Sequence, residues 1–441
     1  MTVIRRRVSG IAALAVSAAL VLGGCAASDT DTNDNAGTCE TPTVVTMLGT
    51  IKVEIQEQFK DAVEEYNSTN TDCVEVQILE AAADQTFLAN ITPLYEAGEA
   101  PVISYTLQEI PDMAPKVMDW TGTELAGLAA AGTLDTATID GKIVGIPSTV
   151  EAFGLLYNKA VLDEAGVDPA AITTRSELEA AFKAVEATGR KAIHFSGLWW
   201  SLGAHFTNIY HTTASDTREG RLAILEELKG GTKDLIKDPQ FTNWLDTFDL
   251  LKKYSIKDAT IADDDYDKGV FNLADGEVGF WFMGNWAEPN LLTEVPDGQF
   301  GVMPVPLSDD AASYGNDGIS VGVPGYLMID EEQSTPEERE GAMAFLKWFL
   351  TTPEGQLRWA GPVEEGGMNF IPVYSGFTVQ PKTFMSGVIA QYVNAGKSLQ
   401  WVNSAYPAGL QEKYGAAAQK YYQGKSSRAE FAKELQAAWT N

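Results

Sequence analysis

The sequence predicts an α/β fold divided into two lobes or domains, on the basis of two observations. Segments rich in β-branched residues alternate with segments in which apolar residues recur at helical spacing, a pattern typical of α/β layers with mainly parallel sheets. Once the first 24 residues and the polar stretch behind them are set aside, about 400 residues remain, which exceeds one typical domain. We therefore expect the helices and strands to build two α/β units rather than one.

The N-terminal segment has the pattern of an export signal. The arginines at positions 5–7 precede an uncharged apolar stretch, 8–22, of about 15 residues, which is short for a bilayer span of roughly 20. The stretch ends in Leu-Gly-Gly-Cys25, which resembles the lipobox of bacterial lipoproteins, whose cysteine becomes the lipidated first residue of the mature protein. We expect residues 1–24 to be a lipoprotein signal peptide and Cys25 to carry the lipid, palmitate included; the alternative is an uncleaved membrane anchor. The polar run 25–38 predicts a flexible tether.

The charge of the chain excludes one class of partner. With 61 acidic residues against 31 basic ones, the formal net charge is −30, and removal of the signal peptide makes it more negative. Such a surface repels phosphate backbones, so we expect no nucleic-acid binding. No second apolar run reaches the length of a membrane span, which predicts a soluble mature protein.

Two cysteines remain after the lipobox, and each lies just ahead of a strand-like segment. Cys39 precedes residues 44–47 and Cys73 precedes residues 74–79, with a helical pattern at 53–66 between the two segments. In a βαβ unit both cysteines would lie at the same edge of neighbouring parallel strands, and export permits oxidation. We expect a disulfide between them; the alternative is two unrelated thiols.

The rest of the chain continues the alternation of strands and helices. Further strand-like runs are residues 101–105, 191–195, 278–281 and 319–329. Further helical patterns are residues 85–97, 174–188, 233–254 and 337–350.

Four segments carry a resemblance to a known family. They are 141–147 (GKIVGIP) followed by STVEAFGLLYNK, 271–280 (FNLADGEVGF) leading to Gly-Asn-Trp286, 319–329 preceded by Gly-Asn-Asp-Gly, and 344–356 (AFLKWFLTTPEGQ). In this order and spacing the chain resembles the family-1 extracellular solute-binding proteins, the group that contains maltose-binding protein.

The resemblance implies a two-lobed, periplasmic-binding-protein-like (type II) fold, with a hinge of crossing strands and a ligand cleft between the lobes. The implied lobes are 39–149 with 311–355, and 150–310 with 356–441. It also implies a monomer without cofactors that captures a small polar solute and delivers it to the permease subunits of an ABC importer, outside the cytoplasm and anchored to the bacterial cell membrane through Cys25. Closure of the lobes removes water from polar contacts and couples occupancy to a shape that a permease recognises.

The aromatic content favours a carbohydrate ligand. A sugar presents apolar faces and hydroxyls, so its site needs aromatic surfaces and directional polar groups, and the chain has 10 Trp and 15 Tyr. Trp286 follows a Gly-Asn turn and resembles the family's cleft tryptophan, so we expect it to stack on the ligand. Glu151 lies at the hinge crossing, where the family commonly places a polar contact. Trp199 and Trp200 follow a strand at its carboxyl end, where open α/β sheets bind ligands, so we expect one of them to face the cleft and the other to be core.

Candidate residues of the first lobe follow the strand after Pro101. Tyr105, Gln108 and Glu109 lie at its carboxyl end, where the family often carries an aromatic and charged ligand residues. The sequence departs from the family here, because residues 102–103 are Val-Ile and the usual aspartate is missing. This departure weakens the exact placement of the three candidates.

Polar residues in turns complete the candidate set. Thr50 ends the first strand, Asn316 and Asp317 precede the returning strand, and Met368 and Asn369 occupy a late glycine-rich loop. Asparagine and aspartate are also ordinary turn formers, so each of these positions has a purely structural alternative.

Other chemistries have less support. His194, His205 and His211 are spaced by eleven and six residues, which fits no short helical ligand pair, and we expect no metal site. The acidic run 263–267 lacks the glycine and glutamate that an EF-hand loop needs.

An exported, lipid-anchored glycoside hydrolase is the competing function, since it too would use carboxylates and aromatics in a sugar cleft. A lipid-anchored adhesin or scaffold is a third class. No Ser-His-Asp elbow, P-loop or dinucleotide fingerprint occurs in the sequence, so we expect a binding protein rather than an enzyme. Several aromatics favour an oligosaccharide over a monosaccharide; polyols and other polar solutes stay open.

Overall fold

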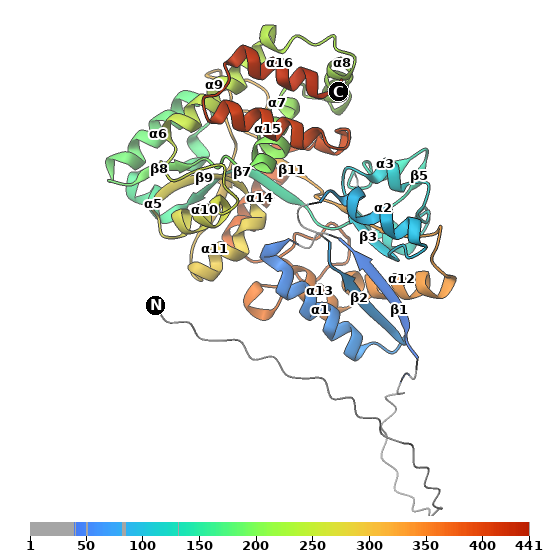
Figure 1. Ribbon diagram of the computed structural model, residues 1–441. Helices are drawn as coiled ribbons and strands as arrows, with labels where there is room; N and C mark the ends of the chain where they lie inside the picture. The colour runs from blue at the N-terminus through green and yellow to red at the C-terminus, as the bar shows by residue number, and fades with distance from the viewer. Residues whose placement is uncertain (1–38, 40, 50–51, 82–84, 131, 441) are drawn as a thin grey trace, which may run out of the picture. The chain divides into compact units, whose positions relative to one another are not determined.

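The computed structural model describes residues 39, 41–49, 52–81, 85–130 and 132–440. Residues 39–441 form one compact unit (Figure 1). The predicted signal peptide, the predicted tether and Cys25 lie outside the described residues. None of the helices in the described ranges combines the length and the apolar composition that a bilayer crossing requires.

The first sheet has five strands in the order β2-β1-β3-β12-β6. Their bounds are β1 Thr43–Leu48, β2 Val74–Leu79, β3 Ile103–Thr106, β12 Tyr326–Ile329 and β6 Ile146–Pro147. β1 runs parallel to β2 and β3, whereas β12 is antiparallel to β3 and β6. A segment from late in the chain therefore completes a sheet that the N-terminal segments begin.

Hydrophobic clusters cover both faces of the first sheet. Because side chains alternate along a strand, Leu327 and Ile329 of β12 join one cluster and Tyr326 and Met328 join the other. The first cluster packs beneath helices α1 (Gln56–Thr69), α12 (Pro336–Thr351) and α13 (Pro353–Ala360), and the second beneath α2 (Phe87–Ala97) and α3 (Ile110–Met113). Both faces of this sheet are thus removed from water.

The second sheet is built around one long strand. Its order is β13-β11-β7-β9-β8, and β10 also pairs with β7. The bounds are β7 Glu151–Asn158, β8 Lys191–His194, β9 Val278–Gly284, β10 Phe300–Met303, β11 Ile319–Gly322 and β13 Ser398–Gln400. All eight residues of β7 are buried, and β7 is antiparallel to β9, β10 and β11.

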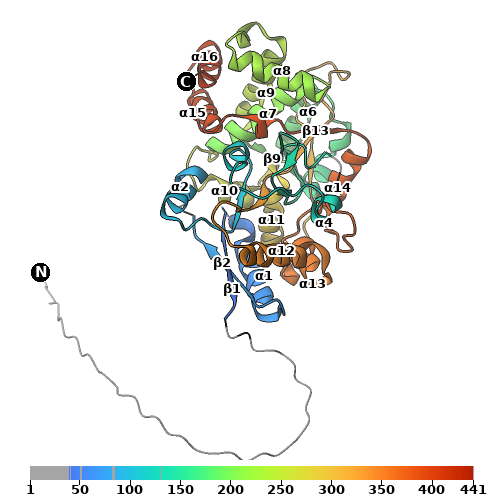
Figure 2. The same cartoon turned by 90° about the vertical axis from the view of Figure 1, so that its right-hand side faces the viewer.

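Helices surround the second sheet and share its large hydrophobic cluster. The helices on this side are α5 Lys159–Ala165, α6 Arg175–Ala187, α7 Thr207–Thr213, α8 Arg218–Lys229, α9 Pro239–Tyr254, α10 Asp265–Ala274, α11 Glu288–Glu294, α14 Phe384–Asn394, α15 Leu410–Tyr422 and α16 Arg428–Ala438. α15 packs beside α16, and α12 beside α13 (Figure 2). The remaining short elements are α4 Glu124–Leu128, β4 Thr138–Ile139 and β5 Lys142–Ile143.

Most predicted elements agree with the structure, and the boundaries have local causes. The predicted strand 74–79 coincides with β2. The helix predicted at 53–66 begins with a 3-10 turn, Val53–Ile55, before α1. The helix predicted at 233–254 begins instead at Pro239, because proline fits the first helical turn and the Asp238 side chain accepts the amide of Gln240.

Two sequence-based expectations need correction. The sheets are mixed rather than mainly parallel, since β7 and β12 each pair only antiparallel with their neighbours. The run 319–329, predicted as one strand, is two strands in different sheets, β11 and β12. The break falls at Val-Pro324-Gly325, where proline has no N–H to donate and the Tyr105 ring lies so close to Gly325 that a side chain there would collide with it.

The chain passes between the two sheets at three places. Residues 148–150 join β6 to β7, residues 323–325 join β11 to β12, and residues 375–383 lead from the first cluster to α14. β11 belongs to the second sheet, although the sequence-based boundaries put it in the first lobe. Trp359 and Tyr374 pack in the first core, although those boundaries put them in the second lobe.

The predicted disulfide is confirmed. Cys39 and Cys73 are bonded, with their Cα atoms 5.6 Å apart. They lie just ahead of β1 and β2, whose residues Thr43 and Val74 are register partners in a parallel pair. The bond therefore ties together the N-terminal ends of two adjacent strands.

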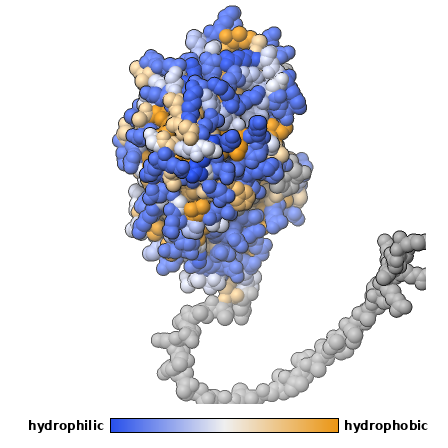
Figure 3. Space-filling view, turned by 90° about the vertical axis from the view of Figure 1, so that its left-hand side faces the viewer, coloured by the Kyte–Doolittle hydropathy of each residue, from blue (hydrophilic) through white to orange (hydrophobic). Residues whose placement is uncertain are grey.

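The visible surface is mainly hydrophilic. Figure 3 shows one face of the molecule, on which hydrophilic residues predominate and apolar residues occur in small separate groups. The large apolar side chains that are exposed come from elements spread along the chain, among them Val44, Phe271 and Leu357.

Candidate functional site

The candidate site is a set of three adjoining cavities that all include Lys52 and Glu151. The largest measures about 530 Å³ and is called the cleft below. Its lining residues come from both sides of the fold, and are Lys52, Glu54, Leu107, Gln108, Glu109, Glu151, Trp200, Ala204, His205, Trp286, Pro324, Trp401, Asn403 and Gln411. The site thus lies where the segments that follow strands of the first sheet meet those of the second.

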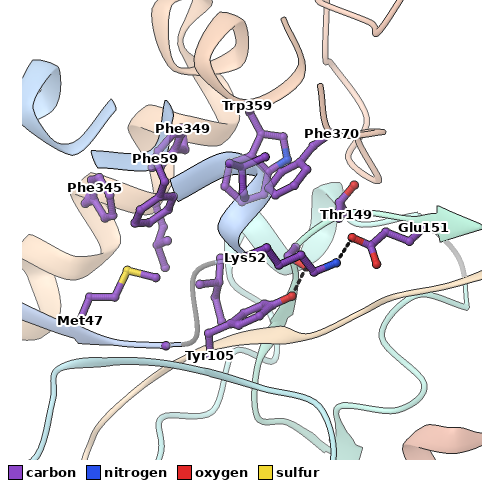
Figure 4. Close-up of a pocket in the computed structure, with 15 residues that line it drawn as sticks. Met47, Lys52, Phe59, Tyr105, Thr149, Glu151, Phe345, Phe349, Trp359 and Phe370 are labelled. Atoms are coloured by element: carbon purple, nitrogen blue, oxygen red, sulfur yellow. Dashed lines mark hydrogen bonds and ion pairs between the residues drawn. The ribbon is translucent and has the colours of Figure 1, made fainter. Parts of the chain in front are cut away.

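An ion pair joins the two sides of the cleft. The Nζ atom of Lys52, which follows β1, contacts a carboxylate oxygen of Glu151, the first residue of β7 (Figure 4). The Lys52 side chain is 30% exposed and that of Glu151 only 5%. Burial raises the pKa of Glu151, and the neighbouring Lys52 ammonium opposes this effect. Lys52 Nζ also lies 5.2 Å from the ring centroid of Trp286, within cation–π range.

An apolar cavity of about 60 Å³ adjoins this ion pair. Figure 4 shows Phe59, Phe345 and Phe349 on one side of it and Trp359 and Phe370 on another. The hydroxyl of Tyr105 lies 3.3 Å from that of Ser148, and burial raises the pKa of Tyr105. This cavity is too small for a sugar ring, so it bounds the cleft rather than forming the ligand site.

Aromatic rings form one wall of the cleft. The ring centroid of Trp286 lies 4.8 Å from that of His205, 6.5 Å from that of Trp200 and 6.5 Å from that of Phe153. Trp286 follows directly on β9 through a 3-10 turn, and its ring lies against Gly284, where any side chain would collide with it. The wall offers flat apolar surfaces next to the Lys52–Glu151 pair, a combination suited to polyhydroxylated rings.

Several buried polar atoms of the cleft residues have no hydrogen-bond partner among the described residues. They are Gln108 Nε2, His205 Nδ1, Trp401 Nε1 and Asn403 Oδ1. An unpaired buried donor or acceptor costs about 1–3 kcal/mol, which a hydroxylated ligand would offset. The set includes donors and an acceptor, so it can serve hydroxyl groups in either role.

The structure brings together seven of the residues predicted from the sequence. Glu151, Trp286, Trp200, Gln108 and Glu109 line the cleft, Tyr105 lines the apolar cavity and Asn369 lines the third, of about 20 Å³. Of the Trp199–Trp200 pair, Trp200 is the one that faces the cleft. Contact with a ligand stays a prediction for all seven.

Other predicted residues lie elsewhere. Thr50 lies outside the described residues. Trp199, 38% exposed, is not core as one of the tryptophan pair was expected to be, and it lines none of the three cavities. The amide of Asn316 is buried and bonds Leu307, Ser308 and Asp310, and Asp317 pairs with Lys397 at 3.0 Å. The Asn316 amide holds the turn before β11, which fits the structural alternative for that residue, and a ligand contact by Asn316 or Asp317 stays a prediction.

Asn369 is part of a buried polar group. Its Nδ2 donates to Glu288 Oε2 at 3.0 Å, and the Thr383 hydroxyl donates to the same oxygen at 2.9 Å. Burial raises the pKa of Glu288 to about 7, and the bonds from Thr383 and Asn369 oppose this shift.

Sequence reasoning missed six polar or aromatic residues of the cleft: Lys52, Glu54, His205, Trp401, Asn403 and Gln411. Lys52 caps the short 3-10 turn Val53–Ile55 after β1, and Glu54 belongs to that turn. Ligand residues are expected at such a strand end, so position alone could have suggested both. Trp401 and Asn403 follow β13, a three-residue strand without a clear sequence pattern. Within the described ranges, no group of three or more His, Cys, Asp and Glu residues is placed to hold a metal ion.

The comparisons with known proteins agree with this fold. The profile of the bacterial extracellular solute-binding proteins matches residues 61–378. No curated protein matches the chain in sequence.

Solved structures of other proteins resemble this chain along most of their own length. A raffinose complex of the solute-binding protein RafE has a TM-score of 0.72 at 15% identity, covering 90% of this chain and 98% of that one. A sugar transporter from Bacillus licheniformis in complex with stachyose has a TM-score of 0.69 at 16% identity, covering 90% and 98%. A family 1 extracellular solute-binding protein from Bifidobacterium longum subsp. infantis has a TM-score of 0.64 at 20% identity, covering 90% and 99%. With two α/β lobes and a profile match over most of its length, the chain belongs to the bacterial extracellular solute-binding proteins.

Proposed function

We propose that the protein binds an uncharged oligosaccharide in the cleft and delivers it to the permease of an ABC importer. The observation that carries the proposal is the cleft wall, in which Trp200, Trp286 and Trp401 lie beside the Lys52–Glu151 pair and beside buried polar atoms without partners among the described residues. Aromatic faces match the apolar faces of sugar rings, and the polar atoms match hydroxyls.

The charge of the cleft favours an uncharged ligand. Its lining includes three carboxylates, Glu54, Glu109 and Glu151, and one ammonium, Lys52. The excess of negative charge repels acidic sugars at close range. A volume of about 530 Å³ leaves room for more than one sugar ring, and two of the structural neighbours hold raffinose and stachyose.

We propose that each of the two lobes is built around one of the two main sheets. We assign residues 39–147 with 326–374 to the first lobe and 151–322 with 384–440 to the second, with the three passages between them as the hinge. A ligand held by Lys52 and Gln108 on one side and by Trp286 on the other would favour the closed arrangement, because only that arrangement makes both sets of contacts. Lipidation of Cys25, anchoring to the cell membrane and a monomeric state complete the proposal.

Binding of a named sugar panel tests the proposal. The panel contains raffinose, stachyose, maltotriose, chitotriose and xylotriose, with galacturonic acid trimer as the acidic comparison. A panel sugar at 100 times its dissociation constant should stabilise the protein by about 2.7 kcal/mol, seen as a raised melting temperature. Small-angle scattering of the same sample should show a smaller radius of gyration. Absence of binding by every neutral sugar would refute the proposal.

The same mixtures separate transport from hydrolysis. A binding protein leaves the sugars intact after long incubation at high protein concentration. Release of reducing ends in proportion to protein would favour the glycoside hydrolase instead. Binding only to large polymers, without a change in scattering, would favour an adhesin or scaffold.

A further inference from the structure

We propose that His205 is a specificity-determining residue of the cleft, whose imidazole hydrogen-bonds one hydroxyl group of the bound oligosaccharide. This inference rests on the proposed function and deepens it, by assigning a ligand contact to a residue that neither the sequence motifs nor the family match identifies.

The local backbone brings His205 to the cleft. Residues Ser201–Phe206 form a π-helix that continues directly into α7. A π-turn adds a residue to the helical turn and changes the direction of the side chains within it, and such turns are frequent at functional sites. Ala204 and His205 of this turn line the cleft.

Close packing against α15 fixes the π-turn in place. Gly203 lies against the backbone of Gln411 and Gly415, and Gly415 lies against the backbone of Trp199. Neither glycine has room for a side chain, so the two helical segments meet backbone to backbone. The direction of the His205 side chain is therefore set by rigid elements, as ligand specificity requires.

The imidazole has polar capacity that the described part of the chain leaves unused. His205 Nδ1 is buried and lacks a hydrogen-bond partner there, and its ring is surrounded by Phe153 at 4.9 Å, Trp286 at 4.8 Å and Trp200 at 5.7 Å. None of these rings gives Nδ1 a hydrogen-bond partner, and a ligand hydroxyl in the cleft can supply one.

The same surroundings keep the imidazole neutral. Burial lowers the pKa of His205 to about 3, and the Lys52 ammonium acts in the same direction. A neutral imidazole has one donor nitrogen and one acceptor nitrogen, and a hydroxyl group can pair with either of them. His205 therefore offers an uncharged hydrogen-bonding contact to a sugar hydroxyl.

The other two histidines show what distinguishes His205. His194 is buried, with its ring nitrogens 3.2 Å from Asp265 Oδ2 and 3.0 Å from Asn272 Nδ2. His211 shares with His205 a pKa lowered to about 3 and a ring nitrogen without a hydrogen-bond partner within the described chain, although His211 is buried and His205 half-buried. It packs among Tyr406 and other core aromatics, however, and lines none of the three cavities. His211 is thus a matched control.

The test compares variants His205→Phe, His205→Asn and His211→Phe by calorimetric titration with the panel sugar that the wild type binds most tightly and with its monodeoxy analogues. We expect His205→Phe to weaken binding about tenfold, the effect of one lost hydrogen bond. The wild type and His211→Phe should bind one monodeoxy analogue about tenfold more weakly than the parent sugar. His205→Phe should bind that analogue and the parent sugar equally well. His205→Asn, which keeps a donor and an acceptor, should retain the discrimination in part.

The outcomes separate this inference from the proposed function. Suppose that the wild type binds a panel sugar and that the His205→Phe variant is folded, as its melting curve shows. If this variant then binds the sugar as tightly as the wild type does, the inference fails and the proposed function stands. If His205→Phe weakens all monodeoxy analogues by the same factor as the parent sugar, His205 acts through packing and the inference also fails. If the wild type binds no panel sugar, both fail.

Discussion

Replacement of Glu288 by glutamine should remove a pH dependence from the stability of the fold. Glu288 is the first residue of α11 and only 3% exposed. It accepts hydrogen bonds from Asn369, which follows α13, and from Thr383, which caps α14, so it joins α11 to two segments that are distant in the sequence. Burial raises its pKa from 4.5 to about 7.

The size and sign of the effect follow from this shift. A carboxyl group with a raised pKa holds its proton more tightly in the folded state, so folding becomes less favourable as the pH rises from the unfolded pKa to the folded one. For these two pKa values the cost is about 1 kcal/mol at pH 5 and about 3 kcal/mol at pH 8. The neutral amide of Glu288→Gln escapes this cost at every pH. The difference in unfolding free energy between wild type and variant should therefore change by about 2.5 kcal/mol over this range, in favour of the variant at high pH.

Guanidinium denaturation at pH 5, 6, 7 and 8 measures this change. The lowered pKa values of His205 and His211 make stability fall as the pH drops below about 6.5, but they act equally in wild type and variant and cancel in the difference. A constant offset is expected, because the glutamine amide loses one acceptor. Glu64→Gln, at an exposed position of α1, is the control. Parallel stability curves for wild type and Glu288→Gln between pH 5 and 8 would refute the reasoning.

The other predictions concern the cleft and the disulfide. Trp286→Ala should weaken binding of the best panel sugar at least tenfold and destabilise the fold by about 3 kcal/mol or more. Trp199→Ala, at a 38% exposed position, should change neither the affinity nor the stability. If titration and melting show the same losses for the two variants, Trp286 does not belong to the site. Lys52→Met leaves the Glu151 carboxylate buried without its partner, so it should destabilise the fold by about 1–2 kcal/mol more than Glu151→Gln does. Denaturation curves in which Glu151→Gln is the less stable variant would contradict the burial of that pair. Replacing both cysteines of the Cys39–Cys73 bond, 34 positions apart, with serine should cost about 3–4 kcal/mol in denaturation, and an unchanged midpoint would count against the bond.

The sequence predicted the elements better than their assembly. Strand 74–79 was predictable because its alternating apolar side chains belong to a locally defined pattern. Residues 319–329 look equally strand-like, yet the structure divides them between two sheets. The division depends on which distant strands are available to pair, β7 for one part and β3 for the other, and this information is not local. Pro324 and Gly325 were the only local sign of the break.

The candidate site was predictable where a motif carried it. Trp286 and Glu151 stand in motifs with a recognisable order, and both line the cleft. His205 and Trp401 stand in no such motif. The direction of His205 depends on a π-turn that is held by packing against α15, and Trp401 reaches the cleft because β13 pairs with β11, an arrangement that no short stretch of sequence specifies.

The interleaving of the chain has a consequence for how the protein is made. The first core contains Val45 near the N-terminus but also Phe345 and Tyr374, and β12 fills the place in its sheet between β3 and β6. A chain that emerges from the ribosome N-terminus first therefore holds β1, β2 and β3 without their β12 partner while residues 107–325 are synthesised, and without the covering helix α12 until residue 351 has followed. Closing such long loops is slow, and the exposed strands are open to wrong pairings in the meantime. The N-terminal strands begin the first sheet, yet that sheet can be completed only after β7, β8, β9, β10 and β11 of the second sheet have been synthesised.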